Sequence, residues 1–104
     1  MENKKYTLRF LPLFEQDLAE TVDYISYRLK NPDAAARLVD EVQGAIQKRL
    51  NYPEAFEPYP SLKERQHPYY RIYVKNYIVF YVVIDDVMEV RRLIYNRRNI
   101  KEQL

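Results

Sequence analysis

The sequence has no cysteine, one glycine and one histidine among its 104 residues. Without cysteine there is no disulfide framework, no thiolate metal site and no cysteine nucleophile, which fits a reducing cytoplasm. A single histidine excludes a histidine-rich zinc site, and a single glycine cannot build a glycine-rich phosphate loop. We therefore expect no bound metal and no cofactor.

Long apolar runs are also missing. No run approaches the roughly 18 to 20 residues of a membrane span, and the opening MENKKYTLRF lacks the apolar stretch of a signal peptide. The sequence is therefore interpreted as a soluble, cytoplasmic protein with no membrane partner. Apolar residues make up 47% of the chain, enough for one core, and the length predicts a single domain over residues 1–104.

Charge is unevenly distributed along the chain. Residues 1–61 hold 8 Lys/Arg against 10 Asp/Glu, a net charge of −2, whereas residues 62–104 hold 9 against 5, a net charge of +4. An anionic partner would be drawn to the second half. Many surfaces that bind nothing carry a comparable charge, so this excess alone assigns no function.

The first half of the sequence predicts a strand and two helices. Residues 6–11 alternate as a strand that ends at Pro12, which cannot donate to a ladder. A helix over residues 13–30 follows, because apolar residues recur there at spacings of three and four. The residues of this apolar stripe are Phe14, Leu18, Val22, Ile25 and Leu29.

A second helix is expected over residues 32–50. Asn31 is a favourable N-cap and Pro32 suits the first helical position, so the short connection makes an antiparallel helical hairpin. Gly44 lies inside this helix and costs about 1 kcal/mol relative to Ala, for which close packing of another backbone is the expected compensation. The inward-facing residues are Ala35, Leu38, Val42, Ala45 or Ile46, and Leu50.

The rest of the chain predicts a loop and three strands. The loop over residues 51–68 holds four of the six prolines, and we expect Tyr52, Phe56, Tyr59 and Leu62 to pin it to the core. The strands are residues 70–74, 77–84 and 87–95, joined by turns at Lys75-Asn76, with Asn76 tolerant of positive φ, and at Asp85-Asp86. The middle run is apolar on both faces and predicts a central strand. The fold class is α+β, β-α-α-β-β-β, with a helical hairpin packed on a small antiparallel sheet.

Arginine, lysine and tyrosine in the basic half could bind an anionic target. Such side chains hold phosphate backbones and stack on bases. A purely structural explanation is also open, because tyrosine is a favoured strand residue and charged side chains at a sheet edge prevent unwanted pairing with other chains. This explanation accounts least well for the Arg97-Arg98 pair. The candidate target-binding residues are Arg71, Lys75, Arg91, Arg92, Arg97 and Arg98.

Other catalytic chemistry has few candidates. Ser26 and Ser61 lie in a helix and a loop, and the lone His67 precedes a proline. Asp85 and Asp86 mark a turn, and adjacent residues at a strand end point to opposite faces. Neither a Ser/His/Asp triad nor a carboxylate pair is indicated.

Several segments together resemble the RelE/ParE superfamily of type II toxin–antitoxin toxins over essentially the full length. They are the opening Y-x-L-x-F strand, the N-P-x-A-A start of the second helix, and YRIYVKNYIVFYVVIDDVMEVRRLIYNRRN. The resemblance implies a growth-inhibiting toxin associated with plasmid stabilisation. It also implies a cognate antitoxin as partner, in a toxin–antitoxin hetero-oligomer.

RelE-like members of the superfamily cut mRNA on the ribosome with basic groups and a tyrosine. Carried over by position, Arg71 and Arg98 match that set, and Tyr73 and Tyr95 are weaker candidates for a proton carrier. Ile78 stands where an arginine of the central strand is expected. An apolar side chain cannot neutralise the charge that develops on a phosphate, which weakens the nuclease interpretation.

ParE-like members lack this nuclease set, have a longer helical hairpin, and poison DNA gyrase. The resemblance therefore favours a gyrase inhibitor over an enzyme. Two alternatives stay open: a metal-independent, ribosome-dependent mRNA endonuclease of the RelE type, and a non-toxic degenerate scaffold that only binds antitoxin.

Overall fold

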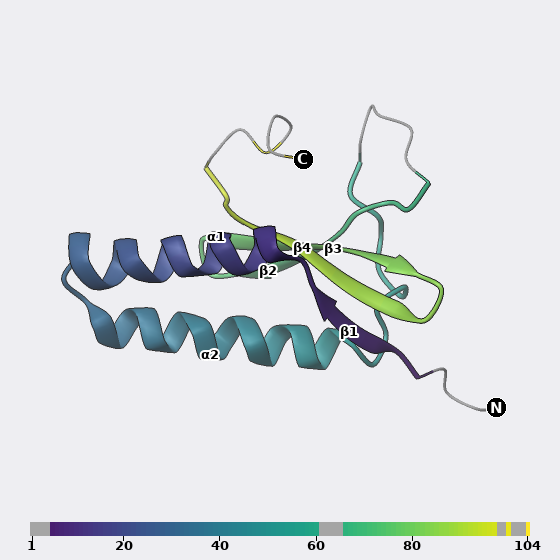
Figure 1. The fold of residues 1–104 in the computed structure, drawn as a ribbon. Coiled ribbons are helices and arrows are strands. Elements are labelled where there is room, and N and C mark those ends of the chain that lie inside the picture. Colours follow the sequence, from purple (N-terminus) through teal and green to yellow (C-terminus); the bar gives the residue numbers. More distant parts are fainter. Residues whose placement is uncertain (1–4, 61–65, 98–99, 101–103) are drawn as a thin grey trace.

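The computed structural model describes residues 5–60, 66–97, 100 and 104 (Figure 1). The first half comprises strand β1 (Thr7–Phe10), helix α1 (Pro12–Asp23) with a π-helical continuation η1 (Tyr24–Arg28), and helix α2 (Pro32–Arg49). The second half comprises the strands β2 (Tyr70–Val74), β3 (Tyr77–Ile84) and β4 (Val87–Tyr95). The predicted order of elements and the α+β fold class are confirmed.

The four strands form one sheet in the order β1-β4-β3-β2. The β2–β3 and β3–β4 pairs are antiparallel, but β1 runs parallel to β4, with Thr7 opposite Val87 and Phe10 opposite Val90. The sheet is therefore mixed, and the expectation of a wholly antiparallel sheet is wrong for this pair. Side-chain alternation specifies which face a strand buries, but it carries no information on the direction of the partner strand.

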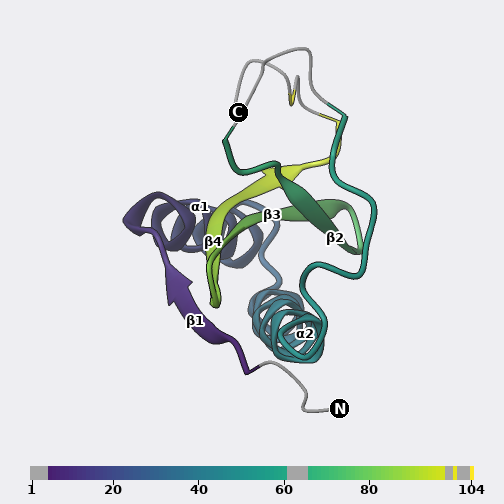
Figure 2. The ribbon, with the colours of Figure 1, turned by 90° about the vertical axis from the view of Figure 1, so that its right-hand side faces the viewer.

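The sheet separates two apolar clusters. Helices α1 and α2 cover one face (Figure 2), whereas Tyr59, Ile100 and Leu104 pack against the cluster on the other face. The main core under the helices includes Phe14, Leu38, Val42, Ile46, Ile72, Val79, Tyr81, Met88, Val90 and Leu93. The opposite side, here called the helix-free face because neither α1 nor α2 covers it, buries Tyr69, Ile78, Phe80, Val82 and Ile94. Strand β3 contributes to both clusters, so the prediction of a central strand buried on both faces is confirmed.

The apolar stripe of the first helix is interrupted near its end. The N–H of Leu29 donates to the carbonyl of Tyr24, five residues earlier, at 3.1 Å. Such a π turn inserts one residue relative to α-helical spacing. Leu29 is consequently 56% exposed, and the expectation that it faces the core is wrong. The end of the hairpin extends past the sheet (Figure 1).

Helix α2 begins and packs as predicted. The Asn31 side chain accepts a hydrogen bond from the N–H of Ala34 at 3.1 Å, and Pro32 occupies the first turn. The predicted inward residues Ala35, Leu38, Val42 and Ile46 are buried. Gly44 is exposed, and a Cβ added there would meet no described atom within 4 Å, so the expected close backbone contact is wrong.

The loop after α2 is held by only some of the predicted residues. Tyr52 is 63% exposed and does not pin the loop, whereas Pro53 is fully buried. Tyr59 does contact the sheet, with its ring edge-on to Phe80 at 5.3 Å. The fourth predicted residue, Leu62, lies outside the described residues.

A hydrogen-bonded network attaches this loop to the core. The buried hydroxyl of Tyr81 donates to the carbonyl of Pro53 at 2.7 Å and accepts from Arg49 Nη1 at 2.9 Å. The Arg49 guanidinium lies 3.5 Å from the centre of the Phe56 ring, so Phe56 contacts the network although its own side chain is largely exposed. Burial raises the pKa of the Tyr81 hydroxyl, and the hydrogen bond from Arg49 opposes that effect.

The turns between the strands lie where the sequence predicts them, but the residues with positive φ differ from the one expected. Lys75 (φ 53°) and Asp85 (φ 56°) take the left-handed conformation, each at the first position of its turn. Asn76, the residue expected to do so, does not. None of the helices that the structure describes is long and apolar enough to span a bilayer.

Candidate target-binding face

A β-bulge in β4 determines where the basic side chains of that strand point. The β3–β4 register shifts between Phe80 and Tyr81, which leaves Arg91 as an extra residue. A bulge bends its strand and re-aims the side chains beside it. The Arg91 guanidinium lies 5.8 Å from the Tyr69 ring of the helix-free face, while Arg92 reaches α1.

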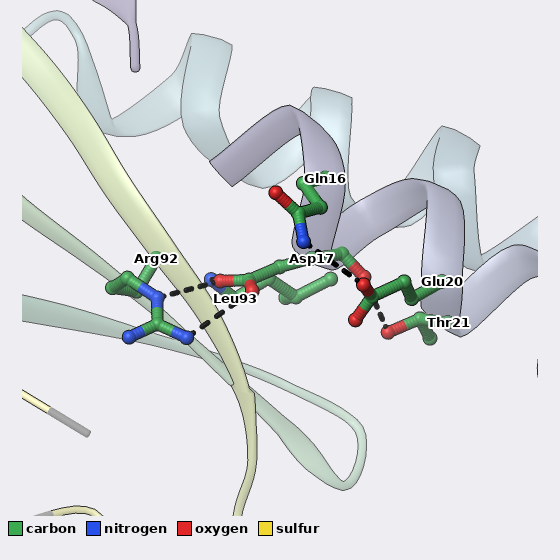
Figure 3. Close-up of polar contacts among 6 residues, drawn as sticks. All are labelled: Gln16, Asp17, Glu20, Thr21, Arg92 and Leu93. Carbon is green, nitrogen blue, oxygen red and sulfur yellow. Dashed lines mark hydrogen bonds and ion pairs between the residues drawn. The ribbon is translucent and has the colours of Figure 1, made fainter. Parts of the chain in front are cut away.

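The contact of Arg92 is a double hydrogen bond to Asp17 (Figure 3). Arg92 Nε donates to Asp17 Oδ2 at 2.8 Å and Nη2 to Oδ1 at 3.2 Å, and Oδ2 also accepts the backbone N–H of Leu93 at 3.0 Å. The two side chains are only 15% and 11% exposed. The hydrogen bond that Arg92 donates to Asp17 raises the pKa of Arg92, so this arginine stays charged and bound to α1.

Glu89 is the buried carboxylate of the sheet. It is 5% exposed and accepts hydrogen bonds from Arg91 Nε at 3.1 Å and Arg9 Nε at 3.1 Å; Arg9 Nη2 donates to the same oxygen as its Nε. Burial alone would raise the pKa of Glu89, but the hydrogen bonds from the two arginines outweigh burial and lower it. The cluster therefore keeps one negative charge between two positive charges.

Arg71 lies on the same side of the sheet, in β2. Its guanidinium carbon is 5.2 Å from the Tyr59 ring centre and 5.8 Å from that of Tyr73. It makes no ion pair with any described carboxylate, and its side-chain donors are therefore available. Arg71 is paired with Phe80, and Phe80 is paired with Arg92, the neighbour of Arg91. The backbones of Arg71 and Arg91 are therefore about two strand spacings apart, roughly 10 Å.

The structure distributes the predicted basic residues over two sides of the sheet. Arg71 and Arg91 lie on the helix-free face, and Arg97 is exposed just after β4. Lys75 instead forms an exposed ion pair of 3.4 Å with Glu41 of α2, and Arg92 is bound to α1. Arg98 lies outside the described residues.

The candidate nuclease groups are also divided. Tyr73 is 59% exposed on the helix-free face beside Arg71, whereas Tyr95 alternates to the helix side and lies against Tyr77 at 5.4 Å. Ile78 is 2% exposed in the helix-free cluster, opposite Tyr73. The two tyrosines therefore cannot serve one phosphate together.

Sequence reasoning missed the acidic partners of this face. Glu89 and Arg9 are 80 residues apart, and Asp17 lies off the apolar stripe of the first helix. One local signal did exist, because Glu89 stands between the apolar Met88 and Val90 inside a strand. A charge in such a position requires a partner.

Within the described part of the chain, no group of three His, Cys, Asp or Glu side chains could hold a metal ion.

Comparisons with known proteins give a family match and matches to solved structures. The sequence model of the family described as "ParE toxin of type II toxin-antitoxin system, parDE" matches residues 8–100. A chain of a solved structure, "Chromosomal ParDE TA system from P. aeruginosa", superposes with a TM-score of 0.72 at 13% identity. The match covers 88% of this chain and 97% of that chain, and at this identity it shows a shared fold. No curated protein sequence matches.

Proposed function

Because the chain belongs to the ParE toxin family of type II toxin–antitoxin systems, we propose that it inhibits DNA gyrase in the cytoplasm. A cognate antitoxin silences it in a hetero-oligomeric complex. Its effect on gyrase is that of a bound inhibitor rather than of an enzyme. The structural relative comes from a ParDE system, which supports the same partnership between toxin and antitoxin.

The observation that carries the proposal is the environment of Ile78. Phosphoryl transfer without a metal needs cationic groups around the charge that develops on the phosphate. The middle of the helix-free face instead holds a buried isoleucine, flanked across the strands by Tyr73 and Ile94. This apolar centre favours a surface that binds a partner over one that cleaves a phosphodiester.

The helix-free face is the target-contacting surface in this proposal. Arg71 contributes a guanidinium that lies near two tyrosine rings and makes no ion pair with a described carboxylate. Arg97 adds exposed charge, and Arg91 adds a partly exposed guanidinium that is paired with Glu89. Arginine held by aromatic rings is typical of interface residues that contribute strongly to binding. Arg92 and Lys75 contribute less, because each is already paired with a carboxylate of a helix.

One observation favours the RelE-like alternative. Arg71 and the exposed Tyr73 lie side by side on the helix-free face, which is the pairing that a cation and a proton carrier would need. In that case the protein would be a metal-independent endoribonuclease acting on ribosome-bound mRNA, with Arg98 as the second cation.

Induced expression in a bacterial host separates these functions. Two readouts are followed after induction: chromosomal breakage with the SOS response, and cleavage of transcripts on ribosomes. The proposal predicts DNA damage with intact mRNA. Codon-phased mRNA cleavage without DNA damage would establish the endonuclease. The absence of both effects would favour the degenerate scaffold that only binds antitoxin.

A pair of arginine variants tests the same point at residue level. Arg71→Ala and Arg98→Ala should abolish RNA cleavage by orders of magnitude if these groups stabilise a transition state. For a gyrase inhibitor, Arg71→Ala should weaken gyrase binding without abolishing it. Arg37→Ala, an exposed arginine of α2, is the matched control and should retain full toxicity.

A further inference from the structure

Arg49 is the last residue of α2, and its side chain reaches the edge strand β2. Its Nη1 atom donates two hydrogen bonds, one of 3.1 Å to the carbonyl of Arg71 and one of 2.9 Å to the hydroxyl of Tyr81. These contacts span 22 and 32 residues of the chain. Arg49 lies outside the set of candidate target-binding residues, yet it contacts the backbone of one of them.

The contact with Arg71 is made at the outer side of β2. Val74 pairs with Tyr77 across a two-residue turn, and residues that flank such a turn bond to each other. Alternation then directs the carbonyl of Arg71 away from β3, where Arg49 binds it. Arg49 therefore holds the stretch of backbone from which the Arg71 guanidinium projects.

The same guanidinium holds the loop that follows α2. The Tyr81 hydroxyl, which accepts from Arg49, donates to the carbonyl of Pro53 at 2.7 Å. The guanidinium carbon of Arg49 lies 3.5 Å from the centre of the Phe56 ring, which makes a cation–π contact. The loop is thus attached to Arg49 directly at Phe56, and through Tyr81 at Pro53.

Farther along, the loop brings Tyr59 to the helix-free face. The N–H of Tyr59 donates to the carbonyl of Tyr69 at 2.6 Å, and its ring lies edge-on to Phe80 at 5.3 Å. The guanidinium carbon of Arg71 lies 5.2 Å from the centre of the Tyr59 ring. Arg49 is therefore bonded to the backbone of Arg71 and to the loop that places an aromatic ring beside its guanidinium.

The rings beside Arg71 restrict a long side chain that makes no ion pair with a described carboxylate. The second ring is that of Tyr73, at 5.8 Å. A side chain that is already held in place loses less conformational entropy when it binds a partner. Tyr73 belongs to the same strand as Arg71, whereas Tyr59 keeps its place only while the loop stays attached. The order of the Arg71 side chain therefore depends on Arg49.

We infer that Arg49 is a positioning residue, which holds Arg71 and Tyr59 in the arrangement that binds the target without contacting the target itself. This rests on the proposed function, which makes the helix-free face the target-contacting surface. A residue that only stabilised the fold would act on target binding whether or not Arg71 is present. A positioning residue acts on target binding through Arg71.

A double-mutant cycle on the affinity for purified DNA gyrase separates these roles. Arg49→Met removes the guanidinium and should weaken gyrase binding by about 3- to 10-fold, the scale of one long side chain that must be ordered on binding. In an Arg71→Ala background the same replacement should change the affinity by less than about 2-fold, because the group that Arg49 positions is gone. Equal weakening in both backgrounds would overturn the inference.

A milder variant leaves the hydrogen bonds of Arg49 in place and so preserves the fold. Phe56→Ala removes the largely exposed ring that lies against the guanidinium, and it should weaken gyrase binding by about 2- to 5-fold. Tyr52→Ala, which removes an exposed aromatic side chain of the same loop, is the matched control and should bind gyrase like wild type. An effect of Phe56→Ala that persists without Arg71 would overturn the inference.

Side-chain NMR relaxation tests the inference on the free chain, without gyrase. The order parameter of the Arg71 Nε–H group should fall in Arg49→Met and in Phe56→Ala and stay at the wild-type value in Tyr52→Ala. Unchanged order in all three variants would overturn the inference and leave the proposed function intact. Wild-type gyrase affinity of Arg71→Ala would instead contradict the target-contacting surface of the proposed function, and the inference with it.

Discussion

The carboxylate of Asp17 in α1 holds the guanidinium of Arg92 in β4 through two hydrogen bonds, of 2.8 and 3.2 Å. The same carboxylate accepts the N–H of Leu93, beyond the point where β1 stops pairing with β4. One acidic residue of the first helix therefore completes the edge of the sheet that the short strand β1 leaves uncovered.

Replacement of Asp17 by Asn should destabilise the fold by about 2 to 3 kcal/mol, because it removes the carboxylate charge that lies against the mostly buried guanidinium of Arg92. Urea denaturation measures the change in the free energy of unfolding. Asp40→Asn, on the exposed side of α2, is the control and should stay within about 0.5 kcal/mol of wild type. Equal effects of the two variants would remove the structural role assigned to Asp17.

The buried Glu89 should make stability depend on acidic pH. Its pKa is lowered in the folded state, so its contribution is fully present above its unfolded value of about 4.3 and disappears as the pH falls through the folded value. Glu89→Gln should therefore cost about 1 to 3 kcal/mol at pH 7, and the gap to wild type should narrow below about pH 4.

Chemical denaturation across this pH range measures the difference in the free energy of unfolding between wild type and Glu89→Gln. Glu57→Gln, on the exposed loop, provides the baseline for loss of a carboxylate. A gap between wild type and Glu89→Gln that is constant from pH 7 to pH 3 would show that Glu89 carries no linked proton.

The hydroxyl of Tyr81 should contribute to holding the loop after α2. Tyr81→Phe leaves the carbonyl of Pro53 without its donor and removes one acceptor of Arg49, for an expected loss of about 1 to 3 kcal/mol. Thermal unfolding and the rate of proteolysis within residues 51–60 report this loss. Tyr52→Phe removes an exposed hydroxyl and should change neither, so a similar effect of both would refute the network.

Gly44→Ala should stabilise the protein by about 0.5 to 1 kcal/mol, because the site is helical and exposed and an added Cβ would meet no described atom within 4 Å. The increase in Tm is the measurement. If the same variant weakens antitoxin binding while raising Tm, a partner approaches the helix at this position. A fall in Tm would contradict the open surroundings seen at Gly44.

The helical hairpin could be predicted from sequence because its signals are local. Asn31 and Pro32 specify the start of α2, and the spacing of its apolar residues specifies the buried face. The end of the first helix could not be predicted in this way. The π turn adds one residue to the helix without a change in composition. Leu29 therefore fits the apolar spacing of the sequence, but its side chain is exposed in the structure.

The candidate site was predicted less completely, because its contacts are distant in the chain. The basic residues are visible in sequence, but Arg91 and Arg92 are adjacent and look equivalent until the bulge separates them. Their carboxylate partners differ as well, since Arg92 binds Asp17 and Arg91 binds Glu89. Ile78 was informative from sequence because its apolar character does not depend on its surroundings.

The most direct test of the account is a supercoiling assay with the purified chain, DNA gyrase, ATP and relaxed plasmid. The account predicts that the chain blocks supercoiling, that cleaved plasmid accumulates, and that antitoxin added beforehand prevents both effects. Unimpaired supercoiling together with cleavage of ribosome-bound mRNA by the same preparation would contradict it.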